Sequence, residues 1–199
     1  MSGPAYLRAF KKLVNTPPSA TQLTTTEEEF YGESDRACGI LLGAMVETAL
    51  EGAIASVLRP DLPTDMAERL FEGEGIMSTF SAKINLGFAL SIFGTTAKHD
   101  LELIKLMRNA FAHCRLPLTF QTPEVRAVCE NLQIPDTNAK VPVSVYERTP
   151  TQILVHIPDK TSPKYPRFLF ATSCHSIAFR LFAFSKRKFL PAPPSSGLP

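Results

Sequence analysis

The chain has no tryptophan, and aromatic residues make up only 9% of its 199 residues. Its four cysteines are widely separated, and no two of them are spaced as in the common zinc or redox motifs. Because no long apolar run or cleavage-like site begins the chain, we expect reduced, mostly buried thiols and a cytoplasmic location. A disulfide scaffold and a cysteine-based metal site are therefore excluded, and no cofactor is expected.

The chain also lacks a long apolar run without charge. Its richest apolar stretch, Ala37 to Leu58, contains Glu47 and Glu51, so we predict a core helix rather than a membrane span. The two carboxylates have no accompanying histidine motif, so solvated helix surface is favoured over metal ligation. Gly39 and Gly43 continue the same ridge, and such small residues allow another helix to approach closely.

Charge is unevenly distributed along the chain. Between Glu27 and Glu74 there are 12 acidic and 3 basic residues, whereas the chain from Lys160 onward has 7 basic residues and no acidic ones. The acidic part has the wrong sign for nucleic acid. The basic part is suited either to phosphate or to the acidic part of the protein or of a second copy.

Start and stop signals predict a series of helices joined by short turns. Thr26 with Glu29 matches a capping box, and the following helix either continues to Leu58 or restarts with Ser34 as its cap. Further helices are expected from Asp65 to about Gly73, from Ser78 or Thr79 to Phe93 with Gly94 as the stop, from Thr95 or Thr96 to before Pro117, from Pro123 to before Ile134-Pro135, and from Phe168 to Lys188.

The remaining segments differ in character. A short amphipathic helix is expected at residues 6–14, and residues 136–166 contain five prolines and β-branched runs that indicate a loop with one short hairpin. We therefore predict an all-α helical bundle over residues 26–189, with a small irregular or β-hairpin insert before the last helix. An N-terminal helix and linker (1–25) precede it, and a disordered Pro-rich tail (190–199) follows.

Potential chemistry is concentrated in one segment, Arg108-Asn109-Ala110-Phe111-Ala112-His113, which closes a well-patterned helix. On a helical wheel Arg108, Asn109 and His113 fall opposite the apolar side. Arg108 and His113 are separated by about 140° around the axis and about 7.5 Å along it, so they flank a patch rather than converge on one atom. A site built on them needs a substrate lying across the helix or a second helix.

Two interpretations of this segment stay open. In one, His113 moves a proton and Arg108 stabilises a phosphorane-like transition state, so that an RNA 2′-hydroxyl attacks its own phosphate without a metal. In the other, Arg108 pairs with an acidic residue, and His113 lies near a helix end where a cation is favoured.

Five short motifs stand in a defined order: Ser34-Asp35-Arg36, Leu70-Phe71-Glu72-Gly73, Phe80-Ser81-Ala82-Lys83-Ile84, Asp100, and Arg108 to His113. Over roughly residues 30 to 116 their order and spacing resemble the mannitol operon repressor (MltR-like) family. That family is all-helical and is similar to the wider HEPN group. Many HEPN members carry Arg, a polar residue and His at this spacing, and two copies pair so that both motifs line a shared cleft.

The resemblance implies a homodimeric, cytoplasmic transcriptional regulator that acts through protein partners and lacks a recognised DNA-binding motif. Five residues match motif positions and are expected to surround the same cleft: Ser34, Asp35, Arg36, Ser81 and Lys83. The other explanation for these residues is helix capping and a structural ion pair.

The alternative function is a metal-independent HEPN-type ribonuclease, a toxin or defence component, with Arg108, Asn109 and His113 at its site. A third class is a nucleic-acid-binding module that uses Lys186 to Lys188, although a basic cluster at a helix C-terminus also suits the helix dipole. RNA is thus a possible partner, and no membrane partner is expected.

Overall fold

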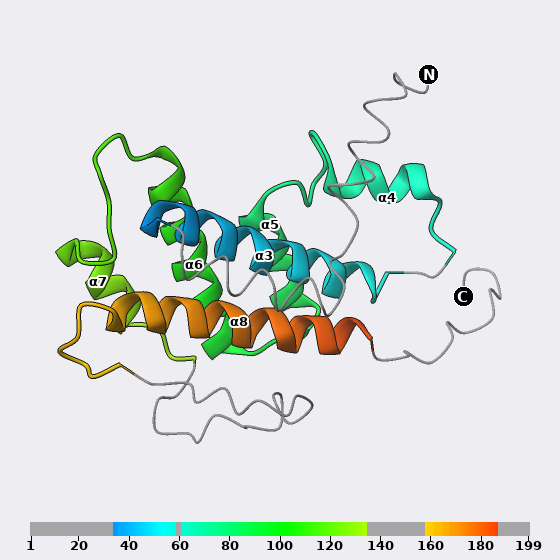
Figure 1. The fold of residues 1–199 in the computed structure, drawn as a ribbon. Helices are drawn as coiled ribbons and strands as arrows, with labels where there is room; N and C mark the ends of the chain where they lie inside the picture. The colour runs from blue at the N-terminus through cyan, green and yellow to red at the C-terminus, as the bar shows by residue number, and fades with distance from the viewer. Residues whose placement is uncertain (1–33, 59–60, 135–157, 187–199) are drawn as a thin grey trace, which may run out of the picture. The chain divides into compact units, whose positions relative to one another are not determined.

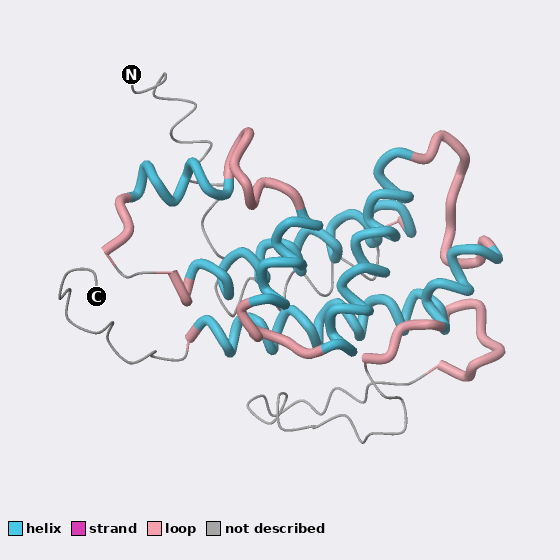
Figure 2. The backbone as a smooth tube through the Cα atoms, turned by 180° about the vertical axis from the view of Figure 1, so that it is seen from behind, coloured by secondary structure: helices cyan, strands magenta, loops and turns pink. Residues whose placement is uncertain are grey.

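The computed structural model describes residues 34–58, 61–134 and 158–186, and every regular element among them is an α-helix (Figures 1 and 2). In order these are α3 (Asp35–Ala55), α4 (Thr64–Phe71), α5 (Phe80–Ala89), α6 (Thr95–His113), α7 (Pro123–Glu130) and α8 (Tyr165–Ser185). The all-α prediction is confirmed for these residues. The chain divides into two compact units, residues 1–34 and 35–199, and all six helices belong to the second.

Several predicted features lie outside the described residues. They are the N-terminal helix at residues 6–14, most of the insert, and the Pro-rich tail. Of the insert, residues 158–164 are described, and they form turns rather than a strand.

The centre of the bundle is formed by α3 and α8, which lie side by side and run in the same direction (Figure 1). Their first turns are joined, since Nη1 of Arg167 donates to Oδ1 of Asp35 at 3.0 Å. Between them and around them lie the fully buried apolar side chains Leu42, Val46, Leu50, Ile54, Ile84, Leu101, Ile104, Phe111 and Phe170. Each such side chain contributes about 1.5–3 kcal/mol by leaving water.

Both central helices are long and apolar enough to cross a membrane, judged by length and composition alone. Core helices of soluble proteins pass the same test, and 44% of each apolar window is buried inside the bundle. The predicted core helix in the stretch from Ala37 is therefore observed as a packed helix, and the cytoplasmic location stays a prediction.

Two glycines bring α6 close to α3. A Cβ atom at Gly39 would lie 2.2 Å from Cδ2 of Phe111, and one at Gly43 would lie 2.6 Å from Cβ of Arg108. The later glycine on α3 thus meets the earlier residue on α6, so the two helices run antiparallel. The expectation that these small residues form a close helix contact is confirmed.

Helix starts agree with the predicted caps in part. In the described residues α3 begins directly after Ser34. Of the two predicted alternatives, this agrees with the helix that starts anew at Ser34. Oγ1 of Thr79 accepts a hydrogen bond from the N–H of Ala82 at 3.1 Å and caps α5 as predicted. The predicted cap at Asp65 is wrong, because α4 begins at Thr64 and the Asp65 carboxylate lies in the first turn instead.

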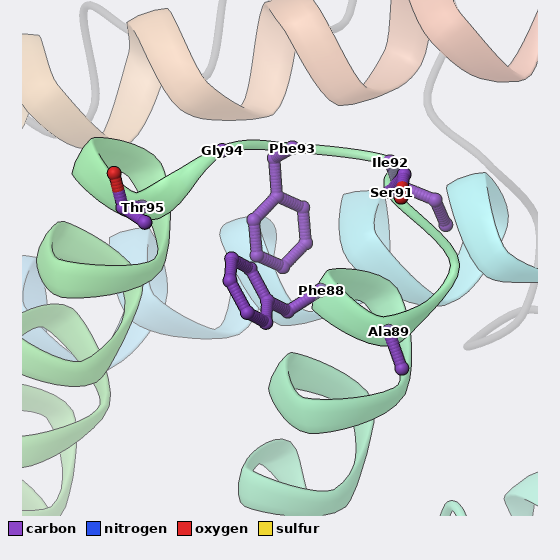
Figure 3. Close-up of a pocket in the computed structure, with 7 residues that line it drawn as sticks. All are labelled: Phe88, Ala89, Ser91, Ile92, Phe93, Gly94 and Thr95. Atoms are coloured by element: carbon purple, nitrogen blue, oxygen red, sulfur yellow. The ribbon is translucent and has the colours of Figure 1, made fainter.

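The end of α5 also differs from the prediction. The helix stops at Ala89 instead of Phe93, because Ser91 adopts a left-handed φ of 57°. The N–H groups of Ser91 and Ile92 then each donate at 3.0 Å to carbonyls in the last turn of α5. This pairing is a Schellman motif with serine at the position that usually holds glycine. Gly94 is consequently the N-cap residue of α6 and not the stop of α5 (Figure 3).

A buried carboxylate fixes the chain that follows α7. Asp100 of α6 has no exposed surface, and it accepts hydrogen bonds from the N–H groups of Gln133, at 2.9 Å, and Ile134, at 2.7 Å. Nδ1 of His99 lies 3.0 Å from the same carboxylate. Asp100 therefore satisfies the backbone N–H donors of two residues in the chain that follows α7.

The glycine contact gives a direct stability prediction. Gly39→Ala should lower the free energy of unfolding by about 1–3 kcal/mol, because its methyl group overlaps the Phe111 ring. The matched control is Gly52→Ala in the same helix, where an added Cβ has no neighbour within 4 Å. That substitution should raise stability by about 0.5–1 kcal/mol through helix propensity alone. Urea unfolding of both variants measures the change in the free energy of unfolding. An equal change for the two variants would contradict the close contact between Gly39 and Phe111.

Candidate functional site

Beyond the two glycines, the ridge of α3 continues with Glu47 and Glu51, which bind Lys83 of α5. Nζ of Lys83 lies 3.1 Å from Oε1 of Glu47 and 2.7 Å from Oε2 of Glu51. The side chain of Lys83 is 6% exposed and that of Glu47 is 15% exposed. The expected solvated surface is therefore wrong for Glu47, because packing of α5 and α6 covers this ridge. A carboxylate so covered requires a counter-charge, which Lys83 supplies.

Arg108 joins this cluster from α6. Its Nη2 lies 3.5 Å from Oε2 of Glu47, and its Nη1 donates to Oδ1 of Asn109 at 3.2 Å. Its side chain is 34% exposed, and its stem covers Gly43. Arg108 thus lies at the edge of the polar face of α6 and packs against α3. The helical wheel did not predict this contact with α3. The expected pairing of Arg108 with an acidic residue is observed.

His113 is exposed in the last turn of α6, and a second cation binds the backbone around it. Nη1 of Arg36 donates to the carbonyl of Phe111 at 2.7 Å, and its Nη2 donates to the carbonyls of Cys114, at 2.9 Å, and Leu116, at 3.0 Å. Carbonyls at a helix end have no partner within the helix. Arg36 therefore caps α6 from α3 and holds the backbone that carries His113.

The residues predicted to surround one cleft fall into two groups. Ser81, Lys83, Arg108 and Asn109 gather where α5 and α6 meet the middle of α3. Asp35 and Arg36 lie at the start of α3, where Oδ2 of Asp35 accepts from the N–H of Phe120 at 2.8 Å, and Ser34 lies exposed just before them. Capping and structural ion pairing describe the observed contacts of Asp35, Arg36 and Lys83.

A polar hollow of about 280 Å³ opens beside Arg108. We call it the α3–α5–α6 hollow, and its lining residues are Glu47, Ser78, Thr79, Phe80, Ser81, Lys105, Arg108 and Asn109. The sequence pattern did not identify Ser78 or Lys105 as site residues, and it marked Ser78 only as a possible helix start. Lys105 lies one helical turn before Arg108, and this spacing is the sequence feature that could have placed it beside Arg108. Only the fold shows that α5 faces this turn of α6.

A larger, open depression of about 880 Å³ lies at the loop between α5 and α6 (Figure 3). The rings of Phe88 and Phe93 lie 6.5 Å apart there, and Nζ of Lys98 lies 4.5 Å from the centre of the Phe88 ring. Its lining between Phe88 and Thr95 holds no acid, base or metal ligand. The depression therefore offers packing surface and no site for chemistry.

Cysteine chemistry is not favoured at the three buried positions. Cys38, Cys129 and Cys174 are buried and unbridged, as expected, and Cys114 is half-buried. Burial raises the pKa of Cys129 to about 12, and it also raises the pKa of Cys38 and of Cys174. These thiols stay protonated at neutral pH, so they are not nucleophiles. Within the described residues there is no group of three or more His, Cys, Asp or Glu side chains arranged to hold a metal ion.

Of the basic cluster at residues 186–188, the structure describes only Lys186. It follows the last residue of α8, and its Nζ lies 5.0 Å from the centre of the Phe182 ring.

Comparison of the chain with protein-family models, with curated proteins and with solved structures found no match.

The shared lysine generates a pH prediction. Burial opposes the charge of Lys83, but its hydrogen bonds to Glu51 and Glu47 outweigh that effect and raise the pKa of Lys83 above 10.5. The stability that it contributes is therefore fully present below pH 10.5 and is lost as the pH rises through the folded-state value. Lys83→Met should lower the free energy of unfolding by about 3 kcal/mol at pH 7, because it leaves Glu47 covered without Lys83.

The difference between wild type and Lys83→Met should narrow as the pH rises above 10.5, as followed by urea unfolding between neutral and alkaline pH. Lys160→Met, at an exposed lysine, is the control and should show a small difference at every pH. A difference for Lys83→Met that does not change with pH would contradict the proposed charge coupling.

Proposed function

We propose that this protein is a cytoplasmic regulatory protein of the MltR-like type that acts through protein–protein contacts made by the outer face of α6. The supporting observation is a row of residues on that face, Glu102, Leu106, Asn109 and His113, which we call the α6 contact strip. Leu106 is 54% exposed, and Asn109 and His113 are exposed as well. Their spacing over three turns matches the pattern by which helices recognise a partner helix.

A second copy of the chain is the partner that fits this strip best. In an isologous pair the same surface of each subunit meets itself, and two α6 helices would cross with opposite directions. Glu102 would then oppose the partner's His113, and Leu106 would lie beside the partner's Asn109. The acidic and basic ends of the strip thus complement each other, and one apolar residue lies near its centre.

The position of Arg108 supports contact over catalysis. Its guanidinium is bound to Glu47 of its own subunit and to Asn109. A catalytic arginine must face the same reacting group as the general acid–base residue, whereas Arg108 lies on the α3 side of α6 beside Glu47 and is about 140° around the helix axis from the exposed His113. The regulatory function is therefore the leading proposal.

Leu106→Asp should weaken self-association at least tenfold, because it places a charge at the centre of the α6 contact strip. Sedimentation velocity over a range of protein concentrations measures the association. Leu90→Asp is the matched control, since Leu90 is 44% exposed but lies after α5 and outside the strip. The contact proposal would be overturned if the wild type is monomeric at every concentration. It would also be overturned if Leu106→Asp self-associates as strongly as the wild type.

The second candidate is a metal-independent ribonuclease, and the exposure of His113 on the same helix as Arg108 and Asn109 favours it. In this case the wild type should cleave single-stranded RNA in the presence of EDTA. His113→Ala, an exposed position, should reduce the rate at least 100-fold through loss of the general acid–base group, as measured on a labelled RNA. Arg108→Ala should reduce it as well, with circular dichroism to verify the fold. An inactive wild type would exclude this candidate.

A further inference from the structure

We propose that the α3–α5–α6 hollow is a binding site for a phosphate group. The groups that line it are mainly hydrogen-bond donors. Lys105 and Arg108 carry positive charge, Asn109 has an amide group, and Ser78 and Ser81 have hydroxyl groups that donate or accept. A ligand rich in acceptors and bearing negative charge matches this set.

The carboxylate in the hollow does not cancel these donors. Glu47 is only 15% exposed, and the ammonium of Lys83 lies 3.1 Å from it on the buried side. Lys83 has little exposed surface and does not line the hollow. Lys83 is shared with Glu51, so Arg108 completes the charge balance of Glu47. A guanidinium has five N–H donors, which is more than Glu47 and Asn109 occupy, so the others can serve a ligand.

Both cations are partly exposed, so they can meet a ligand. Arg108 lies 3.5 Å from Glu47, beyond a normal hydrogen bond, and its side chain is 34% exposed. Lys105 pairs with Glu102, whose side chain is 37% exposed. A partly exposed pair such as Lys105–Glu102 is worth at most about 1 kcal/mol, so a phosphate group can replace Glu102 as the partner of Lys105. Arg108 can keep Glu47 and bind the phosphate through its remaining N–H groups. The planar guanidinium of Arg108 matches two phosphate oxygens at once.

The hollow is large enough for a phosphate group. Its volume of about 280 Å³ exceeds that of several waters, each of which occupies roughly 30 Å³ in the liquid. It accommodates a phosphate group with a small organic substituent. Inorganic phosphate and small phosphomonoesters are therefore the ligands proposed for this hollow. This site shares Asn109 with the α6 contact strip but does not depend on self-association or on RNA cleavage.

Calorimetric titration of the full chain with inorganic phosphate, and separately with glycerol 3-phosphate, tests the proposal. Sodium chloride at the same ionic strength and glycerol serve as blanks. Tighter binding of glycerol 3-phosphate identifies a phosphomonoester as the ligand class, and equal binding identifies the phosphate ion. Lys105→Ala should weaken binding at least tenfold. Arg180→Ala, which removes an exposed arginine of α8 outside the hollow, should leave binding unchanged.

Ser81→Glu separates loss of binding from loss of folding. A carboxylate in the first turn of α5 stabilises the helix, yet it places negative charge in the hollow. This variant should keep or raise the melting temperature and lose phosphate binding. The proposal is overturned if neither phosphate compound binds at 10 mM, if Ser81→Glu binds as wild type does, or if a single-stranded RNA without terminal phosphate binds where the small compounds do not.

Discussion

The close approach of α6 to α3 is the constraint on which the rest of the bundle depends. It exists because Gly39 and Gly43 have no side chains, so that the Phe111 ring and the stem of Arg108 lie directly on the α3 backbone. Phe111 in turn contacts Phe120, with ring centres 5.2 Å apart, and Phe120 contacts Phe170 of α8 at 5.5 Å. The contact of Phe111 with Gly39 therefore continues through a chain of aromatic packing that reaches α8.

The same ridge of α3 places charge where the helices meet. Glu47 and Glu51 continue the row that the glycines begin, and Lys83 from α5 lies close to both carboxylates. Glu47 and Lys83 are largely buried, so their ion pair is part of the packing between α3 and α5. Arg108 is bound to the covered Glu47 and also lines the hollow, so one side chain connects the core of the bundle with its surface.

Two neighbouring residues at the start of α3 bind the end of α6, the chain that follows it and the first turn of α8. Asp35 binds Arg167 of α8 and the N–H of Phe120, whereas Arg36 binds three carbonyls at and beyond the end of α6. Their opposite charges match the backbone groups that they meet, since a carboxylate accepts and a guanidinium donates. Together they fix the end of α6, where His113 is exposed.

The sequence by itself determined the helical class of the described residues, the positions of most helix starts and the small-residue ridge of α3. These features are local, because capping side chains and helical periodicity act within a few residues of one another. The sequence also placed Arg108, Asn109 and His113 on one helix.

Only the tertiary structure decided which side chains these residues meet. The pairing of Lys83 with Glu47 joins residues from different helices, and no local pattern carries that information. For the same reason Lys105 and Ser78 became part of a site only when α5 was placed against α6. The early end of α5 is a different case: the left-handed backbone at Ser91 ends the helix, and two local backbone hydrogen bonds hold the turn although serine stands where glycine is preferred.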